Sequence, residues 1–89
     1  MALYEADGRN IMQNAEQGGA PDALFQLGLL YCSGRDVGLD LIEAHKWFNL
    51  AALRGNDEAK HLRVEIAREL TRAQIGTAQR RAREWLARH

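Results

Sequence analysis

The sequence predicts an all-α fold, a right-handed α-solenoid in which about five helices stack as antiparallel hairpins. Apolar residues recur at intervals of three and four along most of the chain, which is the spacing of one helix face. Segment 11–23 also resembles segment 47–59, a displacement of 36 residues that is typical of helical-hairpin repeats. Hydrophobic residues make up 46% of the 89 residues and proline occurs once, which favours packed helices over disorder. Residues 1–89 are expected to form a single domain, because a chain of this length builds one small core.

The first predicted helix covers residues 4–17, whose apolar and small residues share one face. Gly18-Gly19 should end it, because glycine adopts the left-handed cap conformation without a steric penalty. Pro21 then suits the first turn of a new helix, where the amide that proline lacks would have no intrahelical partner. We interpret residues 1–19 as the second helix of a partial repeat and expect the next helix to begin near residues 20–22.

The second predicted helix continues to about Ser33 and is apolar nearly all round, which is typical of a helix with neighbours on several sides. Gly28, near its middle, costs about 1 kcal/mol of helix propensity relative to alanine. We therefore expect a close approach at Gly28 that a side chain would block. Gly34 and Gly38 predict a turn over residues 34–39.

The third predicted helix covers about residues 41–54, and Gly55 should end it. Asp40 and Glu43 at its start resemble a capping box. One side of this helix carries Leu41, Ala44, Trp47, Phe48, Ala51 and Ala52. Together with the preceding helix it completes a full repeat over residues 20–55.

Two further helices are predicted toward the C-terminus. The fourth covers about residues 57–70, and the spacing of Thr71 and Gln74 predicts a capping box that starts a fifth helix. The apolar stripe of the fifth helix consists of Ile75, Ala78, Ala82, Trp85 and Leu86. We interpret residues 56–89 as a C-terminal capping helix pair.

The full repeat resembles a known family, the Sel-one-like repeats, which are relatives of the tetratricopeptide repeats. The matching positions are Ala23, Leu27, Gly28, Tyr31, Gly34, Val37, Asp40, Ala44, Trp47, Ala51, Ala52 and Gly55. Two departures are visible: Asp36 stands where the family turn has a second glycine, and the pattern lapses after Ala59. The lapse is expected of a terminal capping repeat. The resemblance implies an adaptor fold that binds other proteins and has no chemistry of its own.

The resemblance also implies a partner surface on the outer side of the second helix, because in this class of fold the first helix of each pair lines the concave surface. A protein or peptide partner is expected there. The residues concerned are Asp22, Phe25, Gln26, Leu29 and Cys32. The alternative, that a neighbouring helix covers these residues, stays open.

Self-association is a further expectation. Residues 1–19 lack the first helix of their repeat, and solenoids usually need about three repeats for stability, so a homodimer would cover the N-terminal end. The charges are also uneven: residues 1–58 hold nine acidic and four basic residues, whereas residues 59–89 hold eight basic and three acidic ones. The halves therefore carry net charges of −5 and +5, which would attract one another between copies.

The alternative function is electrostatic binding of a nucleic acid or an anionic membrane by the last helix. Its arginines are Arg72, Arg80, Arg81, Arg83 and Arg88. Glu84 lies among them and no aromatic residue is interleaved on the polar side, so we favour a solvated face or pairing with the acidic half of another copy. Neither nucleic acid nor membrane is the partner that we expect.

Catalytic, metal and cofactor sites are not predicted, and we do not expect an enzyme. The chain has one serine, one cysteine and three histidines, none of them at the spacing of a nucleophile or metal motif. We interpret Cys32 as an unreactive free thiol, and Trp47 and Trp85 as packing anchors. No signal peptide or membrane span is visible, so a cytoplasmic location is expected.

Overall fold

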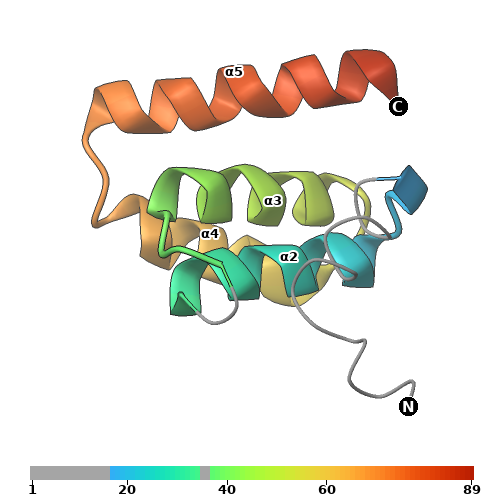
Figure 1. Cartoon of the computed structure of the whole chain (residues 1–89), viewed down its shortest axis with the longest axis horizontal. Coiled ribbons are helices and arrows are strands. Elements are labelled where there is room, and N and C mark those ends of the chain that lie inside the picture. The colour runs from blue at the N-terminus through green and yellow to red at the C-terminus, as the bar shows by residue number, and fades with distance from the viewer. Residues whose placement is uncertain (1–16, 35–36) are drawn as a thin grey trace.

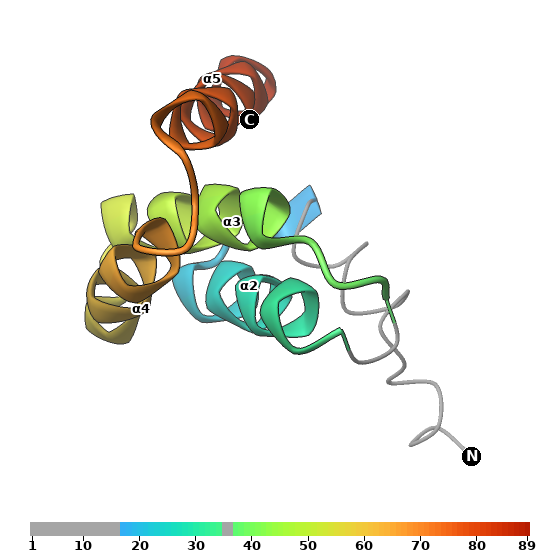
Figure 2. The ribbon, with the colours of Figure 1, turned by 90° about the vertical axis from the view of Figure 1, so that its left-hand side faces the viewer.

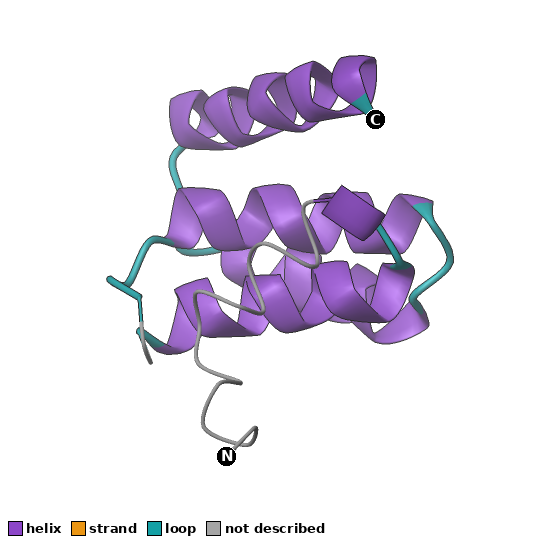
Figure 3. Ribbon diagram, turned by 45° about the vertical axis from the view of Figure 1, so that its right-hand side comes forward, coloured by secondary structure: helices purple, strands orange, loops and turns teal. Residues whose placement is uncertain are grey.

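The structure, a computed structural model, describes residues 17–34 and 37–89, and every regular element in them is an α-helix (Figure 1, Figure 3). The helices are α2 (Pro21–Ser33), α3 (Leu41–Leu53), α4 (Asp57–Ala67) and α5 (Arg72–Arg88). The all-α prediction is therefore confirmed for this part of the chain. The helix predicted over residues 4–17 falls almost entirely outside the described residues, and so do Arg35 and Asp36 of the predicted turn.

Helix α3 is the centre of the molecule. The principal contacts between helices are those of α3 with α2, with α4 and with α5. Helices α2 and α4 run antiparallel to α3, whereas α5 runs parallel to α3 and lies on its other side (Figure 1, Figure 2). Residues 56–89 contain two consecutive helices, α4 and α5, each of which has α3 as its main packing partner.

Local signals set both ends of α2 and the start of α5 where the sequence predicted them, whereas α4 ends at Ala67, short of the predicted end near residue 70. Pro21 begins α2, and Gly34 ends it with a φ of 73° while its amide donates a hydrogen bond to the Leu30 carbonyl. Thr71 and Gln74 form the predicted capping box at the start of α5. The Thr71 hydroxyl accepts from the Gln74 amide at 3.1 Å, and the Gln74 side chain accepts from the Thr71 amide at 2.8 Å.

The start of α3 differs from the predicted capping box. The Asp40 carboxylate caps the helix by accepting from the amides of Ile42 and Glu43, at 3.1 and 3.0 Å. The Glu43 carboxylate, however, accepts from Trp47 Nε1 at 3.1 Å and from the Arg81 guanidinium at 3.0 Å. Glu43 therefore joins α3 to α5 instead of completing the cap.

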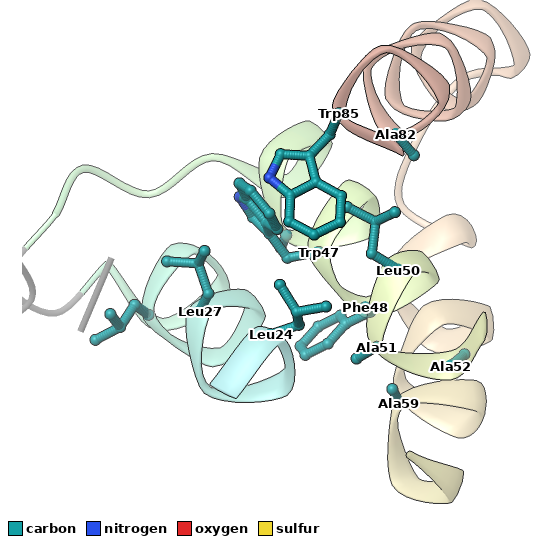
Figure 4. Close-up of a cluster of buried hydrophobic side chains, with 12 residues drawn as sticks. Leu24, Leu27, Trp47, Phe48, Leu50, Ala51, Ala52, Ala59, Ala82 and Trp85 are labelled. Carbon is teal, nitrogen blue, oxygen red and sulfur yellow. The ribbon is translucent and has the colours of Figure 1, made fainter. Parts of the chain in front are cut away.

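Large apolar side chains fill the contact between α2 and α3 (Figure 4). Leu24 and Leu27 of α2 are fully buried, and so is Phe48 of α3. A Cβ atom placed on Gly28 would lie 2.5 Å from two carbon atoms of the Phe48 ring. The close approach predicted at Gly28 is therefore present, and the group that approaches is an aromatic ring.

Small residues line the contact between α3 and α4, as expected where two helices come close together. The buried residues there are Ala51, Ala52 and Ala59 (Figure 4). Asn56 caps α4, since its side-chain oxygen accepts from the Ala59 amide at 2.9 Å. The Arg63 guanidinium of α4 donates to the Asn49 side chain of α3 at 2.9 Å, which adds a polar tie beside the alanines.

Two tryptophans anchor α5 on α3. The rings of Trp47 and Trp85 meet edge to face with their centroids 5.9 Å apart. The Arg54 guanidinium lies 5.0 Å from the Trp85 ring and donates to the Gly19 carbonyl at 2.9 Å, and the His89 ring stacks on Trp85 at 4.1 Å. The prediction that both tryptophans are packing anchors is confirmed, because Trp47 is 1% and Trp85 7% exposed.

Candidate functional site

The candidate site lies along the outer side of α2. This helix directs Leu24, Leu27 and Gly28 into the core, which leaves its opposite side uncovered by α3. A pocket of about 300 Å³ opens beside the C-terminal half of α2. Its lining residues are Gln26, Leu29, Leu30, Cys32 and Ser33.

The structure brings together three of the five residues predicted for partner binding. Gln26, Leu29 and Cys32 all line the pocket. Leu29 and Cys32 are half-buried and pack against the edge of the core, and Gln26 is exposed at the rim. The pocket therefore has an apolar wall and a polar rim.

The other two predicted residues lie outside the pocket lining. Asp22 is exposed in the first turn of α2, where its carboxylate accepts a hydrogen bond from Asn56 Nδ2 at 3.0 Å. Phe25 is half-buried, and its ring centroid lies 5.7 Å from that of Phe48. Phe25 thus extends the core between α2 and α3, and Asp22 links the starts of α2 and α4.

Two lining residues, Leu30 and Ser33, were not predicted. Ser33 follows Gln26 by seven residues and Leu29 by four, and this helical spacing could have indicated it. Leu30 is a core residue with one edge at the pocket, and the sequence pattern contains no signal for such an edge.

Cys32 contributes an apolar surface to the pocket wall. Its thiol donates weakly to the Leu29 carbonyl, with the sulfur 3.6 Å from the oxygen. Burial raises the pKa of the Cys32 thiol, which favours the neutral form over the nucleophilic thiolate. These observations support the interpretation of Cys32 as an unreactive free thiol.

The described segments around α2 in the sequence carry a negative formal charge, and one arginine, Arg54, lies against the Gly19 carbonyl just before the helix. Residues 17–34 and 37–45 contain three carboxylates, Asp22, Asp40 and Glu43, and neither lysine nor arginine. Asp40 lies at the C-terminal end of α2, because its amide donates to the Tyr31 carbonyl at 3.0 Å. A helix C-terminus carries a partial negative charge, and the last turn of α2 has no basic residue to offset it.

The arginines of α5 divide into two groups. Arg81 is half-buried and forms the 3.0 Å ion pair with Glu43 on α3. The exposed arginines of α5 are Arg72, Arg80, Arg83 and Arg88. Since Arg81 holds α5 in place, only the exposed group is free to meet a phosphate.

The described residues contain neither of two further kinds of feature, a cluster of metal ligands and a membrane-spanning helix. Within residues 17–34 and 37–89, no three or more His, Cys, Asp or Glu side chains are grouped so that they could hold a metal ion. In the same residues, none of the helices combines the length and the apolar character that crossing a bilayer requires.

A buried histidine gives the fold a predicted pH dependence. His45 on α3 is 4% exposed, and its Nδ1 atom has no hydrogen-bond partner among the described residues. Burial lowers the pKa of His45, and the positive charge of Arg63 lowers it further. The unfolded chain therefore binds a proton at His45 more readily than the folded chain does.

We expect the free energy of unfolding to fall as the pH drops below about 6.5, the usual pKa of histidine, and to continue falling until His45 is protonated in the folded state. Urea denaturation at about pH 7.5 and about pH 5.5 measures this loss. His45→Gln should reduce the loss, because the substitution removes the group that binds the additional proton in the unfolded chain. Equal pH dependence in His45→Gln and the wild type would contradict the assignment.

Comparison with known proteins assigns no family. No protein-family model, curated protein or solved structure matches this chain. The function is therefore inferred from the residues and the geometry of the chain itself.

Proposed function

We propose that this chain is a non-enzymatic scaffold that binds a partner protein or peptide along the outer side of α2. The observation that carries the proposal is the pocket of about 300 Å³ beside the C-terminal half of α2. Its apolar wall, which includes Leu29 and Cys32, suits an apolar side chain of the partner, and Gln26 at the rim can hydrogen-bond to a polar group.

The repeat uses different residues for the core, for the helix ends and for the pocket, and this separation supports the proposal. Residues that carry the resemblance to Sel-one-like repeats serve the core or the helix ends. The buried ones are Leu27, Gly28, Ala44, Trp47, Ala51 and Ala52, and the capping ones are Gly34 and Asp40. The pocket residues Gln26, Leu29, Cys32 and Ser33 lie between these positions and belong to neither group.

We propose that the helices form a solenoid, and the directions of the helices support this arrangement. The antiparallel α2 and α4 and the parallel α5 have the directions relative to α3 that stacked hairpins would give them (Figure 1). We also place the scaffold in a reducing, cytoplasmic compartment, because Cys32 is a free thiol and the sequence has no second cysteine to pair with it.

Phosphate binding by α5 is the weaker alternative. The Glu43 carboxylate already pairs with Arg81, and Ala78, Ala82 and Trp85 of the apolar stripe of α5 are buried. The remaining exposed arginines are interrupted by the exposed Glu84. A surface of this kind is also expected of an ordinary solvated helix face.

The experiment that tests the scaffold compares Leu29→Asp with Val64→Asp. Val64 is a matched control, because it is an apolar residue that is 50% exposed on a different helix, α4. A partner captured by the tagged wild-type chain should be retained by Val64→Asp. It should be lost by Leu29→Asp with at least about a tenfold drop in affinity, which corresponds to about 1.4 kcal/mol.

Circular dichroism of both variants establishes that each remains helical. Retention of the partner by a folded Leu29→Asp variant would refute the assignment of the binding surface to α2. Equal loss in both variants would refute it too, since Val64 lies away from the pocket lining.

A further inference from the structure

We propose that the partner at the α2 pocket is a basic amphipathic helix. An apolar side chain of this helix enters the pocket, and its lysine or arginine residues lie beside the carboxylates at the two ends of α2. This inference rests on the proposed function and specifies the chemistry of the partner.

The shape of the site fits a helix laid along α2. Asp22, Gln26, Leu29 and Ser33 are spaced by four, three and four residues, so they form one stripe along the outer side of the helix. At 1.5 Å per residue this stripe is about 16 Å long, roughly three turns. A partner helix would contact such a stripe through apolar residues spaced at intervals of three and four on one of its faces.

The charges at the ends of the stripe select a basic partner. Asp22 stands at the N-terminal end, and Asp40 lies beside the C-terminal end through its hydrogen bond to the Tyr31 carbonyl. The negative end of the α2 dipole adds to the effect of Asp40. Glu43 contributes little, because Lys46 and Arg81 already pair with its carboxylate at 3.6 and 3.0 Å.

Nearby basic residues do not cancel the preference for a basic partner. Arg35 and Asp36 lie outside the described residues, and their formal charges cancel. Lys46, the one lysine of α3, pairs with Glu43 and lies over the Trp47 ring at 4.1 Å. Arg54, at the end of α3, is held by the Gly19 carbonyl and the Trp85 ring. Asp22 accepts a hydrogen bond from Asn56 and Asp40 caps α3, but neither carboxylate forms a salt bridge with another described residue. The two carboxylates are about nine residues of helix apart, so basic residues about two and a half turns apart on the partner would meet both.

Two synthetic helical peptides test the inference with the intact chain. Both carry the same leucine face, and their polar faces carry either lysine or glutamate. Titration calorimetry at low salt should show that the lysine peptide binds at least about fivefold more tightly, a preference that added salt should reduce. The neutral variant Leu29→Gln should weaken the lysine peptide at least about tenfold, because it removes an apolar wall of the pocket.

Charge-removing variants identify the carboxylates responsible. Asp22→Asn with Asp40→Asn should abolish most of the preference for the lysine peptide. Asparagine can still accept the hydrogen bond from Asn56 at the first position and still cap α3 at the second. Asp57→Asn is the matched control, since Asp57 is an exposed acid in the first turn of α4, and it should leave the preference intact.

The outcomes separate this inference from the proposed function. Equal binding of both peptides, with loss in Leu29→Gln, would overturn the basic partner and keep the α2 pocket as a binding surface. Tighter binding of the glutamate peptide, or no binding of either, would also overturn the basic amphipathic helix. The comparison of Leu29→Asp with Val64→Asp would then decide the scaffold function on its own.

Discussion

Replacing Trp85 with alanine should lower the free energy of unfolding by about 3–5 kcal/mol, the cost of deleting a large buried aromatic side chain. Trp85 is the bulky member of the α5 contact, because the other buried residues of that helix are Ala78 and Ala82. The substitution removes the edge-to-face contact with Trp47 at 5.9 Å and the ring beneath Arg54 at 5.0 Å. A loss of this size is a large share of the total stability of a small domain, which is about 5–15 kcal/mol.

Urea denaturation followed by circular dichroism measures this effect, with Leu86→Ala as the control. Leu86 is the next residue on α5 but is 38% exposed, so its truncation should cost about 1 kcal/mol or less. Similar losses in Trp85→Ala and Leu86→Ala would mean that α5 is not anchored on α3 through Trp85.

Replacing Gly28 with alanine should destabilise the protein, although alanine is the better helix former. The added Cβ would lie 2.5 Å from the buried Phe48 ring, so the ring or α2 must move. Such overpacking costs about 1–3 kcal/mol, and the gain in helix propensity offsets about 1 kcal/mol of it. We therefore expect a net loss of up to about 2 kcal/mol.

Gly76 in α5 provides a control of opposite sign. It is also a glycine inside a helix, but a Cβ at this position meets no atom within 4 Å. Gly76→Ala should therefore stabilise the protein by about 0.5–1 kcal/mol. The two variants are compared by their urea midpoints, and a Gly28→Ala variant as stable as Gly76→Ala would show that Phe48 does not occupy the space beside Gly28.

Local sequence signals predicted the four described helices. Pro21, Gly34 and the Thr71–Gln74 pair act through hydrogen bonds within a few residues, so their effect can be inferred without knowing what the helices contact. The expectation of a close approach at Gly28 also followed from one residue, because glycine lowers helix propensity and a close packing contact can offset that cost. The nature of that contact, the Phe48 ring, depended on the neighbouring helix.

The sequence patterns did not predict the contacts between residues that are far apart in the chain. Glu43 meets Arg81 across 38 positions, and Arg54 meets the Gly19 carbonyl across 35. Helical spacing identifies the faces of a helix, but it does not identify the neighbour that each face meets. The packing of α5 on α3 therefore appeared only in the structure.

Only part of the candidate site was predicted, because helical spacing does not identify which neighbouring side chain each residue meets. Helical spacing placed Gln26, Leu29 and Cys32 near one another, and all three line the pocket. Phe25 was assigned to the same outer surface, yet its ring packs on Phe48 with the centroids 5.7 Å apart. The direction of a side chain at the edge of a helix face depends on its neighbour, which the pattern does not contain.

Amide chemical-shift mapping tests most directly whether the outer side of α2 is the binding surface. The ¹⁵N-labelled chain would be titrated with the lysine peptide, and shifts would be followed for every assigned amide. The largest changes are expected at Gln26, Leu29 and Ser33, with small changes along α4. Changes centred on α5, or no changes at saturating peptide, would contradict this assignment.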